Sequence, residues 1–206
     1  MEEHRFDVVN HETPRLESFE KALGSGKYTD DLSVPGMVYA ELVRSPYSHA
    51  KVLSIDTSEA EKVPGYLGCA LPEESPQMYF NCSGNPPSPL LMADEKVLTD
   101  EPLVLGDRVA VVAAETEEAA HAAAEAVRVE YEVIQPMLDV KAALAPNAPA
   151  LQPHIAPDNI IQRREVSQGD IAAGEAASDI IEEDHFVTPA MQHTTIELTS
   201  CICDFS

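Results

Sequence analysis

The pattern of apolar and polar positions between residues 104 and 133 predicts a strand, a helix and a second strand. Residues 108–114 read RVAVVAA, a nearly continuous run of small apolar residues that is typical of a strand covered on both faces. Thr116 offers a side-chain oxygen as a helix N-cap, and the residues after it are mainly Ala and Glu, which favour helix. Residues 127–133 alternate apolar and charged positions, which predicts a strand with one solvated face. Because the helix presents mostly methyl groups, we expect it to lie close on a sheet as part of a scaffold.

Other short elements are predicted from strand-forming or helix-forming runs between turn residues. We expect strands at 37–44, 50–55, 66–71, 180–186 and 196–205, and short helices at 57–62, 139–144 and 171–177. Residues 16–23 form either a short helix or no regular structure. Residues 72–102 contain six prolines and are expected to form a long surface loop, while residues 145–158 carry four more and are expected to form a semi-extended connector. The last predicted strand runs to the end of the sequence without a cap, so we expect the natural polypeptide to continue.

The composition limits the kinds of partner. The chain has 206 residues with 36 acidic and 13 basic side chains, a formal net charge of −23. This balance argues against binding to nucleic acid or to anionic membranes, which require clustered Lys and Arg. No apolar run approaches the ~20 residues of a membrane helix, and the charged N-terminus does not resemble a secretory signal. A cytoplasmic location is therefore expected, with the acidic residues on a solvated surface.

The four cysteines, at positions 69, 82, 201 and 203, match no zinc or iron–sulfur spacing. In a reducing compartment we expect them to be free thiols, serving mostly as small buried apolar residues. Residues 81–83 fit the N-glycosylation tripeptide, which has no meaning without secretion.

Several sequence patterns that are typical of functional sites are incomplete in this chain. The glycines at 24 and 26 precede Lys27, but a P-loop needs glycine at 21 and Ser or Thr at 28, and a dinucleotide fingerprint needs glycine at 29. A turn is the better interpretation. Ser45 and His49 form a candidate nucleophile–base pair, but no orienting carboxylate or nucleophile elbow surrounds them, which argues against a hydrolase. The acidic run at 182–185 is interpreted as a solvated edge.

His193 and Glu197 would share one face of a helix and could bind a metal there. The β-branched residues between them favour a strand instead. On a strand the two side chains would stand about 13 Å apart at ~3.3 Å per residue. A joint metal site is therefore disfavoured, and a metal-dependent enzyme built on these residues and the 182–185 cluster is the weakest of three hypotheses.

The sequence resembles the xanthine dehydrogenase/aldehyde oxidase family of molybdenum hydroxylases. The resemblance is carried by an ordered set of short motifs: Gly26-Lys27-Tyr28-Thr29-x-Asp31, Pro35-Gly36-Met37-x-Tyr39, Arg44-Ser45-Pro46-x-x-His49-Ala50, Ile55-Asp56-x-x-x-Ala60, Pro64-Gly65, Gly106-Asp107-Arg108-Val109-Ala110, Ala113-x-Glu115-Thr116, Ala119-Ala120 and Val129-Glu130-Tyr131-Glu132. Together they look like the α/β-hammerhead domain that opens the molybdopterin-binding subunit. The proline-rich residues 85–89, with Gly-Asp-Arg at 106–108, look most like bacterial xanthine dehydrogenase large subunits.

The resemblance implies an α+β fold with mixed short sheets and small helices, plus the start of a second domain. The expected division is a lead-in at 1–23, the hammerhead domain at 24–144, a Pro-rich connector with a small helix at 145–179, and the truncated start of the molybdopterin-binding domain at 180–206. The long loop at 72–102 is expected to line the substrate funnel or to face an electron-transfer partner.

The resemblance also implies which functional residues and cofactors belong to other parts of the enzyme. Gln192, His193 and Glu197 are the only candidates for cofactor binding, and Leu198 stands where the family often has proline. Neither the family's glycine-rich pterin loops nor its catalytic glutamate occurs in this sequence, so we expect no catalytic residue and no metal ligand here. The complete enzyme would carry molybdopterin with molybdenum, and partner domains or subunits would carry FAD and [2Fe–2S] clusters. It would hydroxylate a purine, another N-heterocycle or an aldehyde. The alternative is a stand-alone assembly or binding module of a multi-subunit oxidoreductase.

Overall fold

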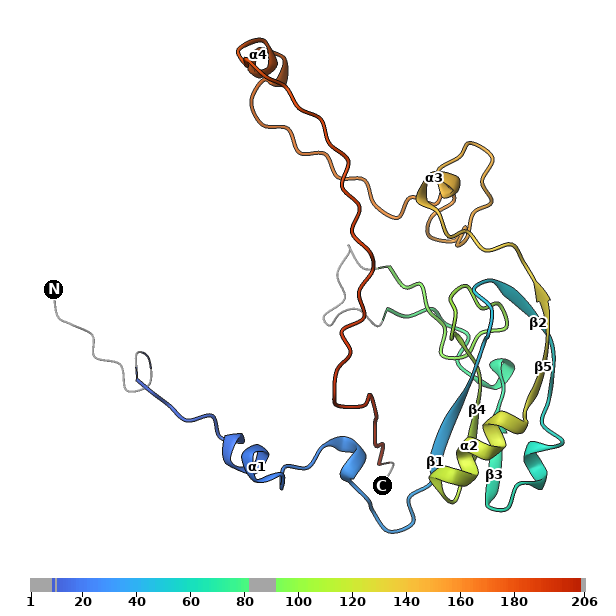
Figure 1. The fold of residues 1–206 in the computed structure, drawn as a ribbon. Helices are drawn as coiled ribbons and strands as arrows, with labels where there is room; N and C mark the ends of the chain where they lie inside the picture. Colours follow the sequence, from blue (N-terminus) through green and yellow to red (C-terminus); the bar gives the residue numbers. More distant parts are fainter. Residues whose placement is uncertain (1–8, 10, 82–91, 205–206) are drawn as a thin grey trace. The chain divides into compact units, whose positions relative to one another are not determined.

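The computed structural model describes residues 9, 11–81 and 92–204 of the chain (Figure 1). The chain divides into two compact units. The larger unit comprises residues 37–176, and the smaller comprises residues 1–36 together with 177–206. Among the described residues, no helix combines the length and apolar character needed to cross a lipid bilayer.

Two small antiparallel sheets form the larger unit (Figure 1). In the first, β4 (Arg108–Ala114) lies between β1 (Tyr39–Arg44) and β3 (Tyr66–Ala70). In the second, β2 (Ala50–Asp56) pairs with β5 (Arg128–Val133). The expected α+β class with short sheets and small helices is confirmed, and so are the five strands expected within residues 37–133.

The predicted strand–helix–strand unit is present as β4, α2 (Glu117–Ala126) and β5, but its two strands belong to different sheets. α2 packs on β1 and β4, as Figure 1 shows. Thr116 caps this helix as expected, because its Oγ1 accepts a hydrogen bond from the Ala119 amide at 3.1 Å.

The core explains why the helix carries small residues. Ala123 is fully buried against the β4 side chains Val109 and Val112, which are also fully buried. Methyl groups let a helix approach a sheet closely without leaving voids, since protein interiors are packed at crystal-like density. The helix and the central strand therefore form one tightly packed layer pair, as expected for a scaffold.

The remaining elements are short. They are α1 (Ser18–Leu23), η1 (Thr29–Asp31), η2 (Ala60–Lys62), η3 (Pro72–Glu74), α3 (Val140–Ala143) and α4 (Ile171–Ala176). The short helix expected at 57–62 is a single 3₁₀ turn at its end, and before it the Asp56 carboxylate accepts a hydrogen bond from the Ser58 amide. The Gly24–Gly26 turn is present, with Gly24 in the left-handed conformation at φ 70° where it ends α1.

The strands expected at 180–186 and 196–205 are wrong for the residues that the structure describes. Residues 180–204 contain no strand, and their side chains are exposed, with Phe186 at 85% and Ile196 at 101% of full exposure. A strand requires a neighbour that satisfies its backbone groups. The apolar pattern predicts burial, but residues 180–204 join neither of the two sheets of the described structure.

The expectation that the cysteines are mostly buried is also wrong. Cys201 and Cys203 are exposed and Cys69 is half-buried, although all three are free thiols as expected. Cys82, the tripeptide at 81–83 and the prolines at 86–89 fall wholly or partly outside the described residues.

Candidate functional site

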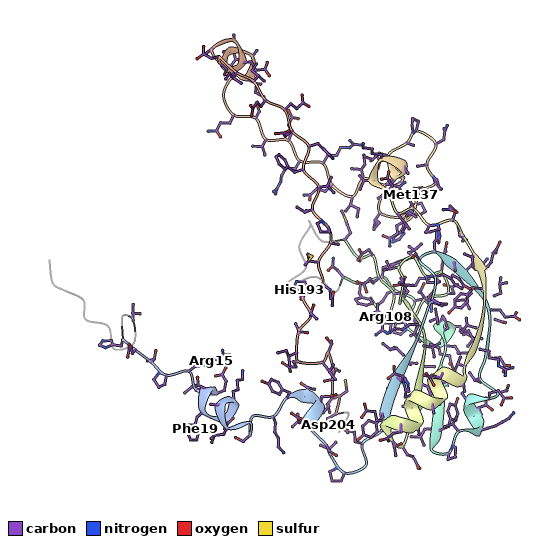
Figure 2. The ribbon with its side chains drawn as sticks, viewed as in Figure 1. Arg15, Phe19, Arg108, Met137, His193 and Asp204 are labelled. Atoms are coloured by element: carbon purple, nitrogen blue, oxygen red, sulfur yellow. The ribbon has the colours of Figure 1, made fainter. Side chains whose placement is uncertain are left out.

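The three residues proposed from the sequence for cofactor binding lie on the extended C-terminal segment, where Figure 2 labels His193. Gln192, His193 and Glu197 are all exposed. The Gln192 carbonyl accepts a hydrogen bond from Thr194 Oγ1 at 3.1 Å, and Thr194 has a left-handed φ of 52°. The segment is therefore bent at Thr194 instead of following the regular strand that was expected.

No metal-binding group of three or more His, Cys, Asp or Glu side chains occurs among the residues that the structure describes. His193 and Glu197 are thus not brought together there with the acidic run at 182–185, which is also exposed. These residues form no enclosed cradle for a cofactor by themselves.

A cavity of about 660 Å³ lies instead in the larger unit, between residues 94–108 and the segment 150–154. Arg108, labelled in Figure 2, organises its wall from the start of β4. Its Nη2 donates to Glu95 Oε2 at 2.7 Å and to the Lys96 carbonyl at 3.1 Å, and its guanidinium lies 5.8 Å from the centre of the Phe80 ring. One side chain thus ties together two stretches of the long loop, which are also joined by a bridge between Phe80 and Glu95.

The segment 150–154 is more than the semi-extended connector expected from its prolines. His154 stacks on Tyr79 with ring centres 4.1 Å apart, and Gln152 Nε2 donates to the Asp94 carbonyl at 3.0 Å. Lys96 approaches the same Tyr79 ring at 5.6 Å. Such aromatic and cation–π contacts are each worth about 0.5–1.5 kcal/mol. They hold the segment against the loop and close one side of the cavity.

The rim of the cavity is shaped by Gly106 and Asp107. Asp107 Oδ2 accepts hydrogen bonds from the amides of Leu103 and Val104 at 2.7 and 2.9 Å, and Gly106 has a φ of 90° that favours glycine. Arg44 Nη1 donates to the Gly106 carbonyl at 2.9 Å. The motif at 106–108 therefore has a structural explanation, because Gly106 and Asp107 shape the turn that leads into β4 and Arg108 holds the neighbouring loop.

Ser45 and His49 do not form a catalytic pair. The Ser45 hydroxyl donates to the Tyr47 carbonyl at 3.0 Å and accepts from the Tyr47 amide at 3.1 Å, and Ser45 is only 2% exposed. His49 lines the cavity, and its buried Nδ1 has no hydrogen-bond partner in the described structure.

Burial raises the pKa of Tyr131, whose ring meets Tyr47 edge-on, so this phenol is neutral at physiological pH.

Several charged side chains that line the cavity bind other groups of the protein. Arg108 pairs with Glu95, Lys96 lies 3.5 Å from Asp100, and Asp107 holds backbone amides. The arrangement stabilises a folded loop. Sequence reasoning missed these contacts, because Arg108 lies 13 residues from Glu95 and no local pattern links the two side chains.

Replacing Arg108 with alanine is expected to open the loop locally without unfolding the unit. The side chains of the Arg108–Glu95 ion pair are about one-third exposed, so the pair contributes little to stability. We expect the loss of all the Arg108 contacts to lower the free energy that keeps the loop folded by about 1 kcal/mol. Amide exchange at Phe80 and Glu95 should then rise roughly fivefold. Hydrogen-exchange mass spectrometry measures this, with Arg128→Ala on β5 as the control. Unchanged exchange at Phe80 would show that Arg108 does not hold the loop.

The comparisons with known proteins agree with this fold. Residues 23–135 match the family model described as aldehyde oxidase and xanthine dehydrogenase, a/b hammerhead domain. The chain is 38% identical over 178 residues to a probable xanthine dehydrogenase subunit of Bacillus subtilis, and the match covers 86% of this chain and 23% of that protein. It is 31% identical over 193 residues to the nicotinate dehydrogenase large molybdopterin subunit of Eubacterium barkeri, covering 93% of this chain and 43% of that one.

A solved structure gives the same result. The aldehyde oxidoreductase of Desulfovibrio gigas superposes with a TM-score of 0.57 at 30% identity, covering 66% of this chain and 16% of that one. The two sheets and the capped helix thus define an α/β-hammerhead domain. The chain belongs to the aldehyde oxidase and xanthine dehydrogenase family, and it spans less than half the length of the relatives described here.

Proposed function

We propose that this chain is the non-catalytic scaffold region of a cytoplasmic molybdenum hydroxylase that oxidises a purine, another N-heterocycle or an aldehyde. The observation that carries the proposal is the match of residues 23–135 to the hammerhead domain. Three relatives sharing this domain are named for xanthine, nicotinate and aldehyde. A domain common to enzymes with such different substrates supports a role in building the subunit rather than in selecting the substrate.

The proposed organisation keeps the division expected from the sequence. Residues 24–144 form the hammerhead domain, and residues 180–206 begin the molybdopterin-binding domain. The exposed apolar side chains of that last segment support this arrangement, because they gain free energy only when a neighbouring surface covers them. Gln192, His193 and Glu197 would then contribute to the edge of a cofactor site whose remaining walls come from other polypeptide.

Molybdopterin would supply the oxygen-transfer chemistry when bound, and FAD and [2Fe–2S] centres on partner domains or subunits would accept the electrons. The contribution of this chain is positional. Arg108, Asp107 and His154 fix the loop and the cavity wall described above, and they give neighbouring parts a rigid surface on which to assemble.

A domain exchange tests the proposal. Residues 23–135 would replace the matching segment of the Desulfovibrio gigas aldehyde oxidoreductase, and molybdenum content and aldehyde turnover would be measured in the purified chimera. We expect a normal molybdenum content and turnover within roughly tenfold of the parent, since losses from imperfect packing are typically 1–2 kcal/mol.

The control chimera carries Ala123→Glu, which disrupts the domain's core. It should lose molybdenum and turnover together. A folded, molybdenum-loaded chimera of the natural sequence without turnover would show that the domain takes part in catalysis. Tight binding of molybdopterin by the isolated 206-residue chain would contradict the scaffold role, as would a defined assembly function without other parts of the subunit.

A further inference from the structure

Two thiols near the end of the described chain lie in contact. The Sγ atoms of Cys201 and Cys203 are 3.5 Å apart, and both residues are exposed. Only Ile202 separates them, so their proximity is local and does not depend on how distant parts of the chain pack. A disulfide has an S–S length of about 2.05 Å, so the sulfur atoms need to approach by only about 1.5 Å to bond.

We propose that Cys201 and Cys203 form a reversible dithiol–disulfide site that reacts with low-molecular-weight disulfides. In the first step the Cys201 thiolate attacks an external disulfide RS–SR, forming a Cys201–S–SR mixed disulfide and releasing RS⁻. In the second step Cys203 loses its proton and attacks the Cys201 sulfur, which forms the Cys201–Cys203 disulfide and releases the second RS⁻. The two thiols lose two protons and two electrons, and the external disulfide is reduced to two thiolates.

Either thiol can make the first attack, because both are exposed and their sulfur atoms lie in contact. The steps are written with Cys203 attacking second, since the hydrogen bond and charge of Cys201 raise the pKa of Cys203, and the reverse order gives the same disulfide. The second, intramolecular attack is faster than attack by a thiol from solution, because a thiol tethered two residues away acts at a high effective concentration.

Cys69 supplies an internal contrast. It lies on β3, is half-buried, and burial raises the pKa of its thiol. Buried, protonated thiols react slowly with disulfides. The sequence thus places a reactive pair and an unreactive single thiol in the same chain. The inference needs no molybdenum, and it concerns the 206-residue chain, in which both thiols are exposed.

The experiment uses the 206-residue chain carrying Cys82→Ser, treated with one equivalent of 5,5′-dithiobis(2-nitrobenzoate). We expect two equivalents of coloured thiolate, a protein mass lower by two hydrogens, and no retained adduct. A Cys203→Ser variant should release only one equivalent and retain one nitrobenzoate group on Cys201. Cys69→Ser should behave like the parent, and dithiothreitol should restore both thiols.

Cys201 and Cys203 are on the surface, so their serine variants are expected to fold. Circular dichroism checks the fold of every variant, including Cys69→Ser at its half-buried position. Two outcomes would overturn the proposal. One is retention of separate adducts on Cys201 and Cys203 in the parent. The other is a reaction of the parent no faster than that of Cys69 in a Cys201→Ser, Cys203→Ser double variant.

Discussion

Replacing Ala123 with glutamate is expected to unfold the larger unit, whereas the same replacement at Ala122 leaves it folded. The two residues are neighbours on α2, but Ala123 is fully buried in the core and Ala122 is exposed. A carboxylate at position 123 would lie among Val109, Val112 and Val127 without a partner. The effective cost of burying such a charge is several kcal/mol, comparable to the ~5–15 kcal/mol by which domains are stable.

The pair of variants isolates burial from other effects. Both change the net charge by the same amount, and the difference in helix propensity between Ala and Glu is below about 0.7 kcal/mol in each case. Urea unfolding followed by circular dichroism measures the free energy of unfolding. We expect a loss of at least ~3 kcal/mol, or no folded protein, for Ala123→Glu, and a change within ~0.5 kcal/mol for Ala122→Glu.

A graded variant keeps the test informative where Ala123→Glu gives no soluble protein. Ala123→Leu adds three carbon atoms without charge, and overpacking of this size typically costs about 1–3 kcal/mol. Equal stability of Ala123→Leu and Ala122→Leu would show that α2 does not pack on β1 and β4 as closely as its methyl-lined face indicates.

The elements of the larger unit were predictable because their signals are local. The apolar run of β4, the Thr116 cap and the alternation of β5 each act within a few residues. The pairing was less accessible, since β4 joins β1 and β3 while β5 joins β2, and these partners lie far away along the chain. Strand pairing depends on how several elements pack together, which no window of the sequence contains.

The cavity illustrates the same limit. Arg108, Glu95 and Phe80 are separated by many residues, and none of them forms a motif with its sequence neighbours that reveals these contacts. In the described stretches 75–81 and 92–102 no helix or strand forms, as the prolines predicted, but the prolines say nothing about the contacts that order these residues. The docking of His154 on Tyr79 was missed for a related reason, because a proline-rich composition indicates extended backbone without indicating where that backbone packs.

The C-terminal segment shows the opposite error, in which a correct local pattern predicted structure that the described chain does not form. Residues 180–186 and 196–202 have strand composition, yet Ile180, Phe186 and Leu198 are 78%, 85% and 68% exposed. The pattern of apolar and polar residues predicts which face of a strand is buried, but the strand forms only where a neighbouring strand pairs with it.

Backbone amides of residues 177–204 are therefore expected to exchange with solvent far faster than those of β4. The β4 amides lie in the central strand of a sheet, and they open only by unfolding of much of the unit. With a stability of at least ~5 kcal/mol this gives protection of roughly 10³–10⁴, whereas a segment outside helices and strands has protection near one. Hydrogen-exchange mass spectrometry of the 206-residue chain measures both regions in one experiment.

A truncated chain ending at Ala176 provides the matched control. If the segment depends on surfaces outside the larger unit, removing residues 177–206 should leave the β4 exchange rates within about twofold of the parent. In the complete subunit the same segment should become protected, because a neighbouring domain would then pair with it. Slow exchange at 180–186 or 196–204 in the 206-residue chain would contradict this account, since it would mean that the segment already has a partner within the chain itself.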